Sequence, residues 1–280
     1  MNEINNIQAQ KANDFYTRHQ GKDILVLPNA WDVSSARIFE QAGFYAIGTT
    51  SAGIAHSLGY AEPEKISREE MLLSIKRIVD AVSLPVSADI EAGYATTAEG
   101  VADTVQLVIK TGAVGVNIED SLDTQDNELL EMQRQVERLE AAREAANSLG
   151  FPFIINARTD IYLLNIGEPH QQLGQVIERA NQYFTAGADC VFIPGVADPN
   201  IISQLVENIH GPINILANPG VPNTVELQRM GVKRVSMGSG PMRATLALIR
   251  HIADELLTNG TYKNFTVNSI PYHEVNELFV

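Results

Sequence analysis

Short runs of apolar and β-branched residues alternate along this chain with longer segments that have the apolar spacing of helices. The runs are mostly continuous, which is typical of parallel strands buried on both faces. Several of the intervening segments end on a glycine a few residues before the next run, as a helix C-terminus does. Eight strands are predicted, at about residues 24–28, 44–49, 85–89, 114–118, 152–157, 189–193, 213–217 and 233–237.

Eight strand–helix units in succession, with no linker between them, predict an α/β protein with a closed (β/α)8 TIM barrel. We expect residues 1–280 to form a single catalytic domain, with 261–280 as a C-terminal extension and a C-terminal helix open to exchange between subunits. A doubly wound open sheet is the alternative. It would normally carry a Gly-x-Gly-x-x-Gly turn after its first strand, whereas this chain has Pro28-Asn-Ala-Trp-Asp32.

Two predicted helices begin with a capping box, Ser67 with Glu70 and Thr96 with Glu99. Two long segments, at about 50–66 and 121–130, follow the second and fourth strands. Barrel active sites lie at the carboxyl ends of the strands, so both segments are candidate lids.

Charge and composition narrow the function. The chain has 20 basic and 34 acidic residues, a net charge of −14, which disfavours nucleic acid and anionic membranes as partners. Its single cysteine, Cys190, allows no internal disulfide and suits a reducing compartment. No apolar run reaches the length of about 18 residues that a membrane span needs. We therefore expect a cytoplasmic protein.

Carboxylates follow two neighbouring predicted strands, Asp89 and Glu91 after the third and Glu119 and Asp120 after the fourth. All barrel strands end at one mouth, and carboxylates packed there raise one another's pKa unless a cation compensates. Oxygen ligands without His or Cys favour Mg²⁺, or Mn²⁺, over Zn²⁺. The pattern predicts a divalent metal site; the alternative is that these acids cap helices or are solvated loop charges.

Candidate anion-binding groups lie at two other strand ends. Arg158 follows the fifth strand, and its planar fork suits a substrate carboxylate; a salt bridge to Glu119 or Asp160 is the alternative, and both can hold together. The stretch Thr49–Gly53 offers hydroxyls and backbone N–H groups to a carboxylate or phosphate oxygen, or forms a plain turn.

Together these residues resemble the isocitrate lyase/phosphoenolpyruvate mutase superfamily over most of the chain. Asp89-Ile-Glu-Ala-Gly-Tyr94 is similar to that superfamily's Asp-x-Asp-x-Gly-Tyr-Gly metal motif, and Ile118-Glu-Asp120 and Ala157-Arg-Thr159 support the match. The resemblance implies a Mg²⁺-dependent lyase-type barrel enzyme that breaks a C–C or P–C bond of a small 2-oxo acid through an enolate. We also expect a homodimer or homotetramer.

The resemblance further implies roles for individual residues. Asp89 is the expected direct metal ligand. The residues expected to hold metal-bound waters are Glu62, Glu91 and Glu119. The expected substrate contacts are Thr50, Ser51, Ala52, Gly53, Arg158 and Asn218. The residues expected to act in catalysis are Arg158, Glu119 and Tyr94.

The chain departs from the superfamily in the segment after the fourth strand. Lyases of the superfamily carry Lys-Lys-Cys-Gly-His there and phosphonomutases carry Lys-x-Asn, whereas 121–127 has no Cys, Lys or His. Cleavage that uses a cysteine acid is therefore disfavoured. Three hypotheses remain: a lyase or decarboxylase for 2-oxo dicarboxylates, a phosphonopyruvate mutase or hydrolase, and a non-catalytic ligand-binding barrel.

Overall fold

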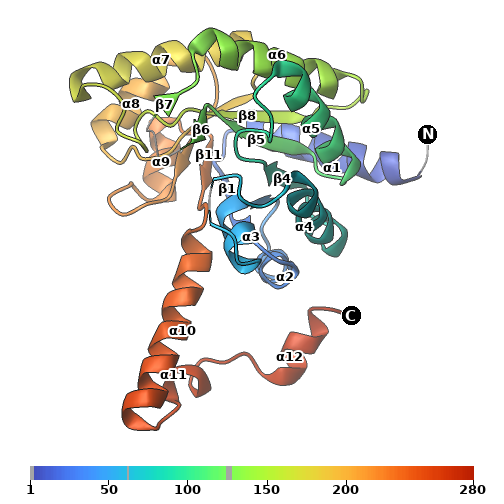
Figure 1. Ribbon diagram of the computed structural model, residues 1–280, viewed down its shortest axis with the longest axis vertical. Helices are drawn as coiled ribbons and strands as arrows, with labels where there is room; N and C mark the ends of the chain where they lie inside the picture. The colour runs from blue at the N-terminus through green and yellow to red at the C-terminus, as the bar shows by residue number, and fades with distance from the viewer. Residues whose placement is uncertain (1–2, 62, 124–127) are drawn as a thin grey trace.

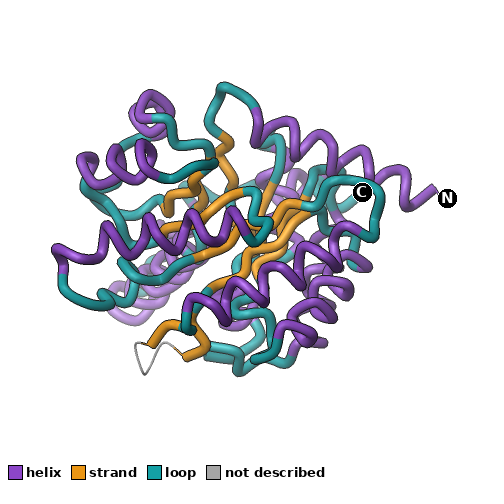
Figure 2. Tube along the Cα trace, turned by 90° about the horizontal axis from the view of Figure 1, so that it is seen from above, coloured by secondary structure: helices purple, strands orange, loops and turns teal. Residues whose placement is uncertain are grey.

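The computed structural model describes residues 3–61, 63–123 and 128–280. Its centre is a parallel sheet curled into a barrel and surrounded by helices (Figure 2). The strand order around the barrel is β1-β11-β10-β9-β8-β5-β4-β3-β2. The parallel strands are β1 (Leu25–Leu27), β2 (Asn29–Ala30), β3 (Ile47–Thr49), β4 (Val86–Asp89), β5 (Gly115–Glu119), β8 (Ile154–Arg158), β9 (Cys190–Ile193), β10 (Ile213–Leu216) and β11 (Arg234–Ser236).

The nine parallel pieces amount to eight barrel strands, because the first strand is broken at Pro28. β1 pairs with β11 and β2 pairs with β3, so the two edges of the sheet belong to one stretch of chain. Proline has no N–H to donate, but the Pro28 carbonyl still accepts a 2.8 Å hydrogen bond from the Gly48 N–H. The prediction of a (β/α)8 barrel is confirmed, and each strand lies within three residues of its predicted bounds.

Helices surround the barrel, and a short antiparallel hairpin that was not predicted, β6 (Ser121–Asp123) with β7 (Glu128–Leu129), follows β5. No helix in the described part of the chain is long and apolar enough to cross a membrane. The helices before the C-terminal region are α1 (Glu3–Gln20), α2 (Val33–Gln41), α3 (Ser51–Ser57), α4 (Arg68–Ala81), α5 (Ala98–Lys110), α6 (Met132–Asn147), α7 (Pro169–Thr185), α8 (Pro199–Asn208) and α9 (Thr224–Met230).

One of the two predicted helix starts needs correction. Ser67 caps α4 as expected, accepting a 3.2 Å hydrogen bond from the Glu70 N–H. α5, however, is capped by Thr97 rather than Thr96, and the Thr97 hydroxyl accepts from the Gly100 N–H at 3.2 Å. The start of this helix is tightly packed, since a Cβ added to Gly100 would lie 2.6 Å from the Ala95 Cβ. Only glycine fits at the third position of this helix.

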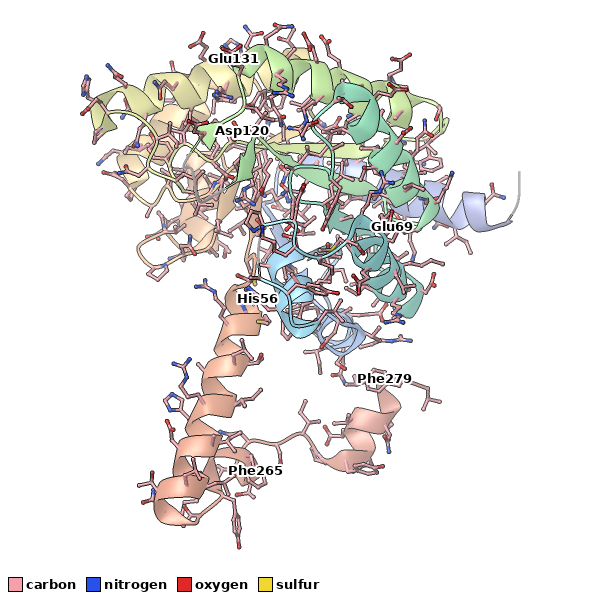
Figure 3. All side chains as sticks on the ribbon, in the orientation of Figure 1. His56, Glu69, Asp120, Glu131, Phe265 and Phe279 are labelled. Carbon is pink, nitrogen blue, oxygen red and sulfur yellow. The ribbon has the colours of Figure 1, made fainter. Side chains whose placement is uncertain are left out.

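The C-terminal region extends away from the barrel (Figure 1). It consists of α10 (Gly240–Asn259), α11 (Lys263–Thr266) and α12 (Tyr272–Glu277). α10 follows β11, where a barrel helix would ordinarily fold back along the sheet, yet it is exposed along most of its length. Phe265 lies at the far end of this region, whereas Phe279 lies closer to the helices of the barrel (Figure 3).

Candidate active site

A cavity of about 360 Å³ lies at the carboxyl ends of the barrel strands and reaches into the barrel interior. Many residues expected to form the site line it, and others pack behind its wall. The lining includes Thr50, Ser51, Ala52, Asp89, Arg158 and Asn218. The lining does not include Gly53, Glu91, Tyr94 or Glu119. Glu62 lies outside the described residues.

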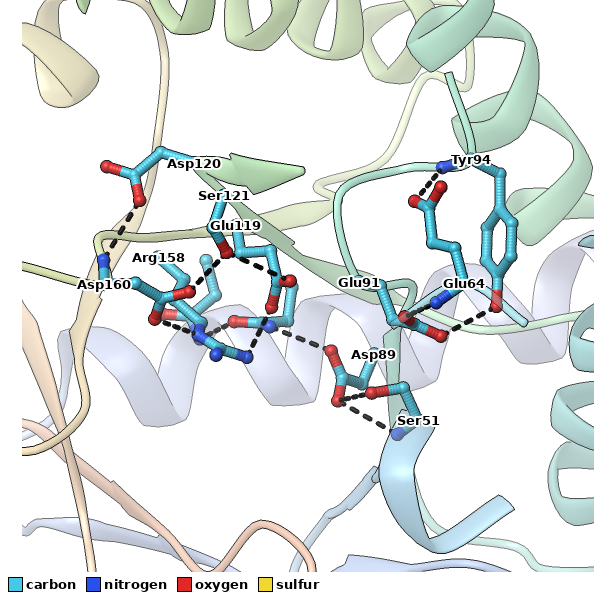
Figure 4. Close-up of polar contacts among 12 residues, drawn as sticks. Ser51, Glu64, Asp89, Glu91, Tyr94, Glu119, Asp120, Ser121, Arg158 and Asp160 are labelled. Carbon is cyan, nitrogen blue, oxygen red and sulfur yellow. Dashed lines mark hydrogen bonds and ion pairs between the residues drawn. The ribbon is translucent and has the colours of Figure 1, made fainter. Parts of the chain in front are cut away.

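Asp89, the last residue of β4, has a fixed side chain (Figure 4). Its Oδ2 accepts from the Ser51 N–H at 3.0 Å and from the Ser51 hydroxyl at 2.9 Å. Its Oδ1 accepts from Asn117 Nδ2 at 2.9 Å, and its own N–H donates to Thr49 Oγ1 at 2.8 Å. A carboxylate oxygen has two lone pairs, so Oδ1 keeps acceptor capacity on the cavity side. Asp89 is thus oriented before any ligand binds.

The N-terminal stretch of α3 donates hydrogen bonds to the Asp89 carboxylate. Thr50 caps this helix, and its Oγ1 accepts from the Gly53 N–H at 3.3 Å. Gly53 serves packing, because a Cβ added there would lie 2.8 Å from the Trp31 Cβ. The Ser51 N–H is bonded to Asp89. The substrate contacts expected from Thr50 to Gly53 remain a prediction. Of these residues, Thr50, Ser51 and Ala52 line the cavity.

Glu91 sits in a strained loop. Glu64, Glu91 and Tyr94 have φ of 41°, 51° and 54°, left-handed values that cost non-glycine residues of order 1 kcal/mol each and cluster at functional sites. The Tyr94 hydroxyl donates to Glu91 Oε1 at 3.0 Å, and the Glu64 N–H donates to Oε2 at 2.6 Å. Burial and the neighbouring Glu91 raise the pKa of Tyr94, so at neutral pH its phenol is a hydrogen-bond donor.

Arg158 joins two buried carboxylates across strands β5 and β8. Its Nη1 lies 2.5 Å from Glu119 Oε2, and its Nε lies 2.6 Å from Asp160 Oδ1. Burial raises the pKa of Glu119 well above its ordinary value, against the opposing effect of Arg158. Burial alone would lower the pKa of Arg158, but Asp160 and Glu119 outweigh it and raise that pKa. The salt-bridge alternative is therefore present, and a guanidinium with five donor hydrogens still has donors for a ligand.

Asp120 takes no part in this cavity. Its carboxylate accepts from the Asp160 N–H at 3.0 Å and from the Tyr183 hydroxyl at 2.7 Å, and Arg179 Nη1 lies 3.3 Å away. Figure 4 shows it apart from Asp89. Asp120 therefore ties β5 to the loop after β8 and to α7.

The side chains fit a metal held by few protein oxygens. Within the described ranges, no three Asp, Glu, His or Cys side chains gather closely enough to hold one ion together. Asp89 and Glu91 nevertheless both raise the pKa of Glu119, which shows an excess of negative charge that a cation would relieve. Mg²⁺ is commonly bound by one or two carboxylates and several waters. Asp89 as the single direct ligand agrees with that donor set.

Polar residues within the strands complete the cavity and were not singled out from the sequence. Asn117, Asn156 and Asn214 line it from β5, β8 and β10, and Arg234 and Arg243 line it from β11 and α10. A signal for the amides was available: each asparagine interrupts an otherwise apolar strand, as in Val116-Asn-Ile118. No such signal points to Arg243, which follows a predicted strand end by several residues.

Fold and cavity define a (β/α)8 barrel with an acidic site at the strand ends, and comparison with known proteins identifies its family. Residues 15–257 match the phosphoenolpyruvate phosphomutase family. The chain is 29% identical to 2-methylisocitrate lyase of Escherichia coli K12 over 266 residues, 88% of this chain and 87% of that one. It is 30% identical to oxaloacetate decarboxylase of Pseudomonas entomophila over 219 residues, covering 75% and 72%.

A solved structure from Burkholderia cenocepacia, provisionally described as a lyase/mutase, superimposes with a TM-score of 0.92. Its sequence identity is 36%, over 98% of this chain and 97% of that one. The chain belongs to the phosphoenolpyruvate phosphomutase family, within the isocitrate lyase/phosphoenolpyruvate mutase superfamily of lyases and phosphomutases. The resemblance drawn from Asp89–Tyr94 and the other strand ends is confirmed, and the chain is an enzyme of this superfamily.

Proposed function

We propose that this chain is a Mg²⁺-dependent lyase that decarboxylates a small 2-oxo dicarboxylic acid. One observation carries the proposal: a single cavity of about 360 Å³ is lined by both Asp89 and Arg158. A metal-binding carboxylate and a carboxylate-binding guanidinium in one small cavity suit a short acid that chelates a cation and presents a carboxylate.

Asp89 would hold the metal directly, and Glu91 and Glu119 would bind waters of its coordination sphere. Glu62 is proposed for the same role on its sequence position alone. When bound, Mg²⁺ would supply positive charge beside the 2-oxo oxygen. Arg158 would bind the carboxylate next to the 2-oxo group, and Glu119 and Asp160 would keep its guanidinium in place.

Decarboxylation needs no general base and no acid for the leaving group. The bond between C3 and the departing carboxylate breaks, its electron pair forms the enolate, CO₂ leaves, and water protonates C3. Cleavage of a hydroxy acid needs in addition a base at the hydroxyl and an acid for the departing carbanion. Residues 121–131 contain no Cys, Lys or His to act as that acid. The similarity to oxaloacetate decarboxylase supports the same choice.

The test is an assay of pyruvate release from oxaloacetate with Mg²⁺, beside Asp89→Asn and, as a control, Asp103→Asn on the exposed face of α5. We expect turnover in the wild type and the control and loss in Asp89→Asn, after subtraction of the metal-only rate. Formation of phosphoenolpyruvate or phosphate from phosphonopyruvate, followed by phosphorus NMR, would favour the mutase or hydrolase alternative instead. Binding of 2-oxo acids without any turnover would favour the non-catalytic barrel.

A further inference from the structure

The deep end of the cavity contains buried polar atoms without partners. Arg234 of β11 is 3% exposed and lines the cavity. Its Nε and Nη1 make no hydrogen bond to any described residue. The Ser87 hydroxyl, also in the lining, is buried and unpartnered in the same sense. Buried polar groups are nearly always satisfied in proteins, so these atoms call for a bound species.

The charge of Arg234 forms no salt bridge with a described residue, and Asp89 is the one carboxylate that raises its pKa. Burial lowers its pKa to about 10, which leaves the guanidinium charged at neutral pH. Burial raises the pKa of the neighbouring Cys190 thiol to about 12 and lowers that of His19 to about 4, so both are neutral. A buried charge without a paired opposite charge is strongly unfavourable. An anion delivered through the cavity would relieve that cost.

Hydrogen-bond directions determine which atoms at the deep end of the cavity, its floor, can bind an anion. Asp89 can only accept from Asn117, so the Asn117 carbonyl faces Asn156 and accepts from Asn156 Nδ2 at 3.0 Å. Asn156 therefore turns its own carbonyl to the floor. Asn214 and Ser236 bond each other at 3.1 Å. Among the described residues at the floor, the donors without a partner are Arg234 and the Ser87 hydroxyl, and both suit a negatively charged acceptor.

We propose that the floor of the cavity is a second anion subsite, formed by Arg234 and Ser87, that takes a carboxylate-sized monovalent anion. It is separate from Arg158, which already pairs with Glu119 and Asp160. Two sources supply such an anion: a free ion from solution, or the remote carboxylate of a bound acid, and only the second of these rests on the proposed function. The subsite itself follows from the unpartnered floor atoms.

The first test measures thermal stability of the full chain, stripped of metal and then freed of chelator by dialysis, as formate is added. At formate about 100 times its Kd we expect wild-type Tm to rise by about 5 °C. Arg234→Met should lose this rise and should melt higher than wild type in anion-poor buffer, because the unpaired charge is gone. Arg243→Gln, which removes the exposed arginine at the rim, should keep the rise. A rise retained in Arg234→Met, or absent from wild type, overturns the proposal.

A second measurement does not depend on a folded variant. Wild-type crystals soaked in sodium bromide should show an anomalous peak beside the Arg234 guanidinium, and peaks elsewhere but none there would contradict the subsite. Succinate then distinguishes the sources in metal-free protein. Competition between succinate and formate, lost in Arg234→Met, assigns the subsite to a ligand's own carboxylate, whereas additive binding assigns it to a free anion. No turnover is measured, so failure of the proposed reaction would not affect these results.

Discussion

Asn117 donates a 2.9 Å hydrogen bond from Nδ2 to Oδ1 of Asp89, the carboxylate on which the proposed metal site depends. Asn117 lies in β5 and is buried, and it also accepts from Asn156 in β8. A chain of amides across two strands therefore fixes the orientation of a carboxylate in a third. Groups of this kind orient metal ligands and strengthen their binding.

Asn117→Ala should weaken Mg²⁺ binding without abolishing it. Loss of an outer hydrogen bond to a metal ligand typically lowers affinity by about 10- to 100-fold. Calorimetric titration of Mg²⁺ in the presence of oxalate, a mimic of the enolate, measures the change. Asn13→Ala, which removes an exposed amide bonded only to its own helix, is the matched control. Equal affinities in both variants would show that Asn117 does not orient the ligand.

Arg158→Lys should impair substrate capture more than folding. Lysine keeps the positive charge between Glu119 and Asp160 but loses the planar fork, so we expect KM to rise about 10-fold or more. Arg158→Met should instead lower the free energy of unfolding by about 3–5 kcal/mol, because two buried carboxylates lose their partner. Arg37→Lys, in a surface ion pair with Glu40, controls for the general effect of the substitution. An unchanged KM in Arg158→Lys would limit Arg158 to its salt bridges.

His19 should make stability depend on pH between about 6.5 and 4. It is 1% exposed beneath the barrel, and burial followed by the charge of Arg234 lowers its pKa from 6.5 to about 4. Below pH 6.5, His19 binds a proton in the unfolded chain but not in the folded chain. The contribution of His19 to stability is therefore full above pH 6.5 and falls as the pH drops toward 4. The loss is about 3 kcal/mol.

Urea unfolding across this pH range tests the role of His19. His19→Gln should flatten the fall, whereas His210→Gln, at an exposed position, should leave the wild-type profile. Identical profiles for His19→Gln and the wild type would mean that other groups, carboxylates included, set the acid sensitivity.

We propose that a second copy of this chain covers α10. Leu246, Ile249 and Leu256 recur at helical spacing on α10 and are 48%, 58% and 46% exposed, an unusual amount of apolar surface for one helix. The same helix leaves the barrel where a covering helix is expected (Figure 1). If two copies exchanged α10, the helix would cover the open position on the partner's barrel, and its own apolar residues would be buried there.

Light scattering should find the wild type as a dimer or tetramer at micromolar concentration. Leu246→Glu with Ile249→Glu should yield a monomer, and Leu73→Glu, at a comparably exposed residue of α4, should not. A monomeric wild type would rule out the exchange.

The barrel was predictable because each strand is a short apolar run and each helix has an apolar stripe. The placement of Asp89 and Arg158 at strand ends followed from the same pattern. Side-chain direction did not follow, since it depends on local backbone. Glu91 is two residues after Asp89, but its φ of 51° turns it to Tyr94 and the Glu64 N–H. No sequence pattern predicts that a glutamate adopts a left-handed backbone conformation.

The polar residues inside the barrel were the second feature that could not be predicted from the sequence. Lys233-Arg-Val-Ser-Met237 reads as a strand, and a charged residue in it suggests an edge or a surface. The structure instead points Arg234 into the barrel, where it is almost fully buried. An inward arginine can be recognised only once the register with β1 and β10 is known. The amides at 117 and 156 likewise gain a role only through each other.

The proposed chemistry depends first on whether Asp89 binds the metal. Calorimetric titration of Mg²⁺ with oxalate present should show one site per chain in the wild type and in Asp103→Asn. Asp89→Asn keeps the size of the side chain and removes the charge, and it should show no binding heat at the same concentrations. One site of unchanged affinity in Asp89→Asn would contradict the assignment of Asp89 as the metal ligand and, with it, the proposed chemistry.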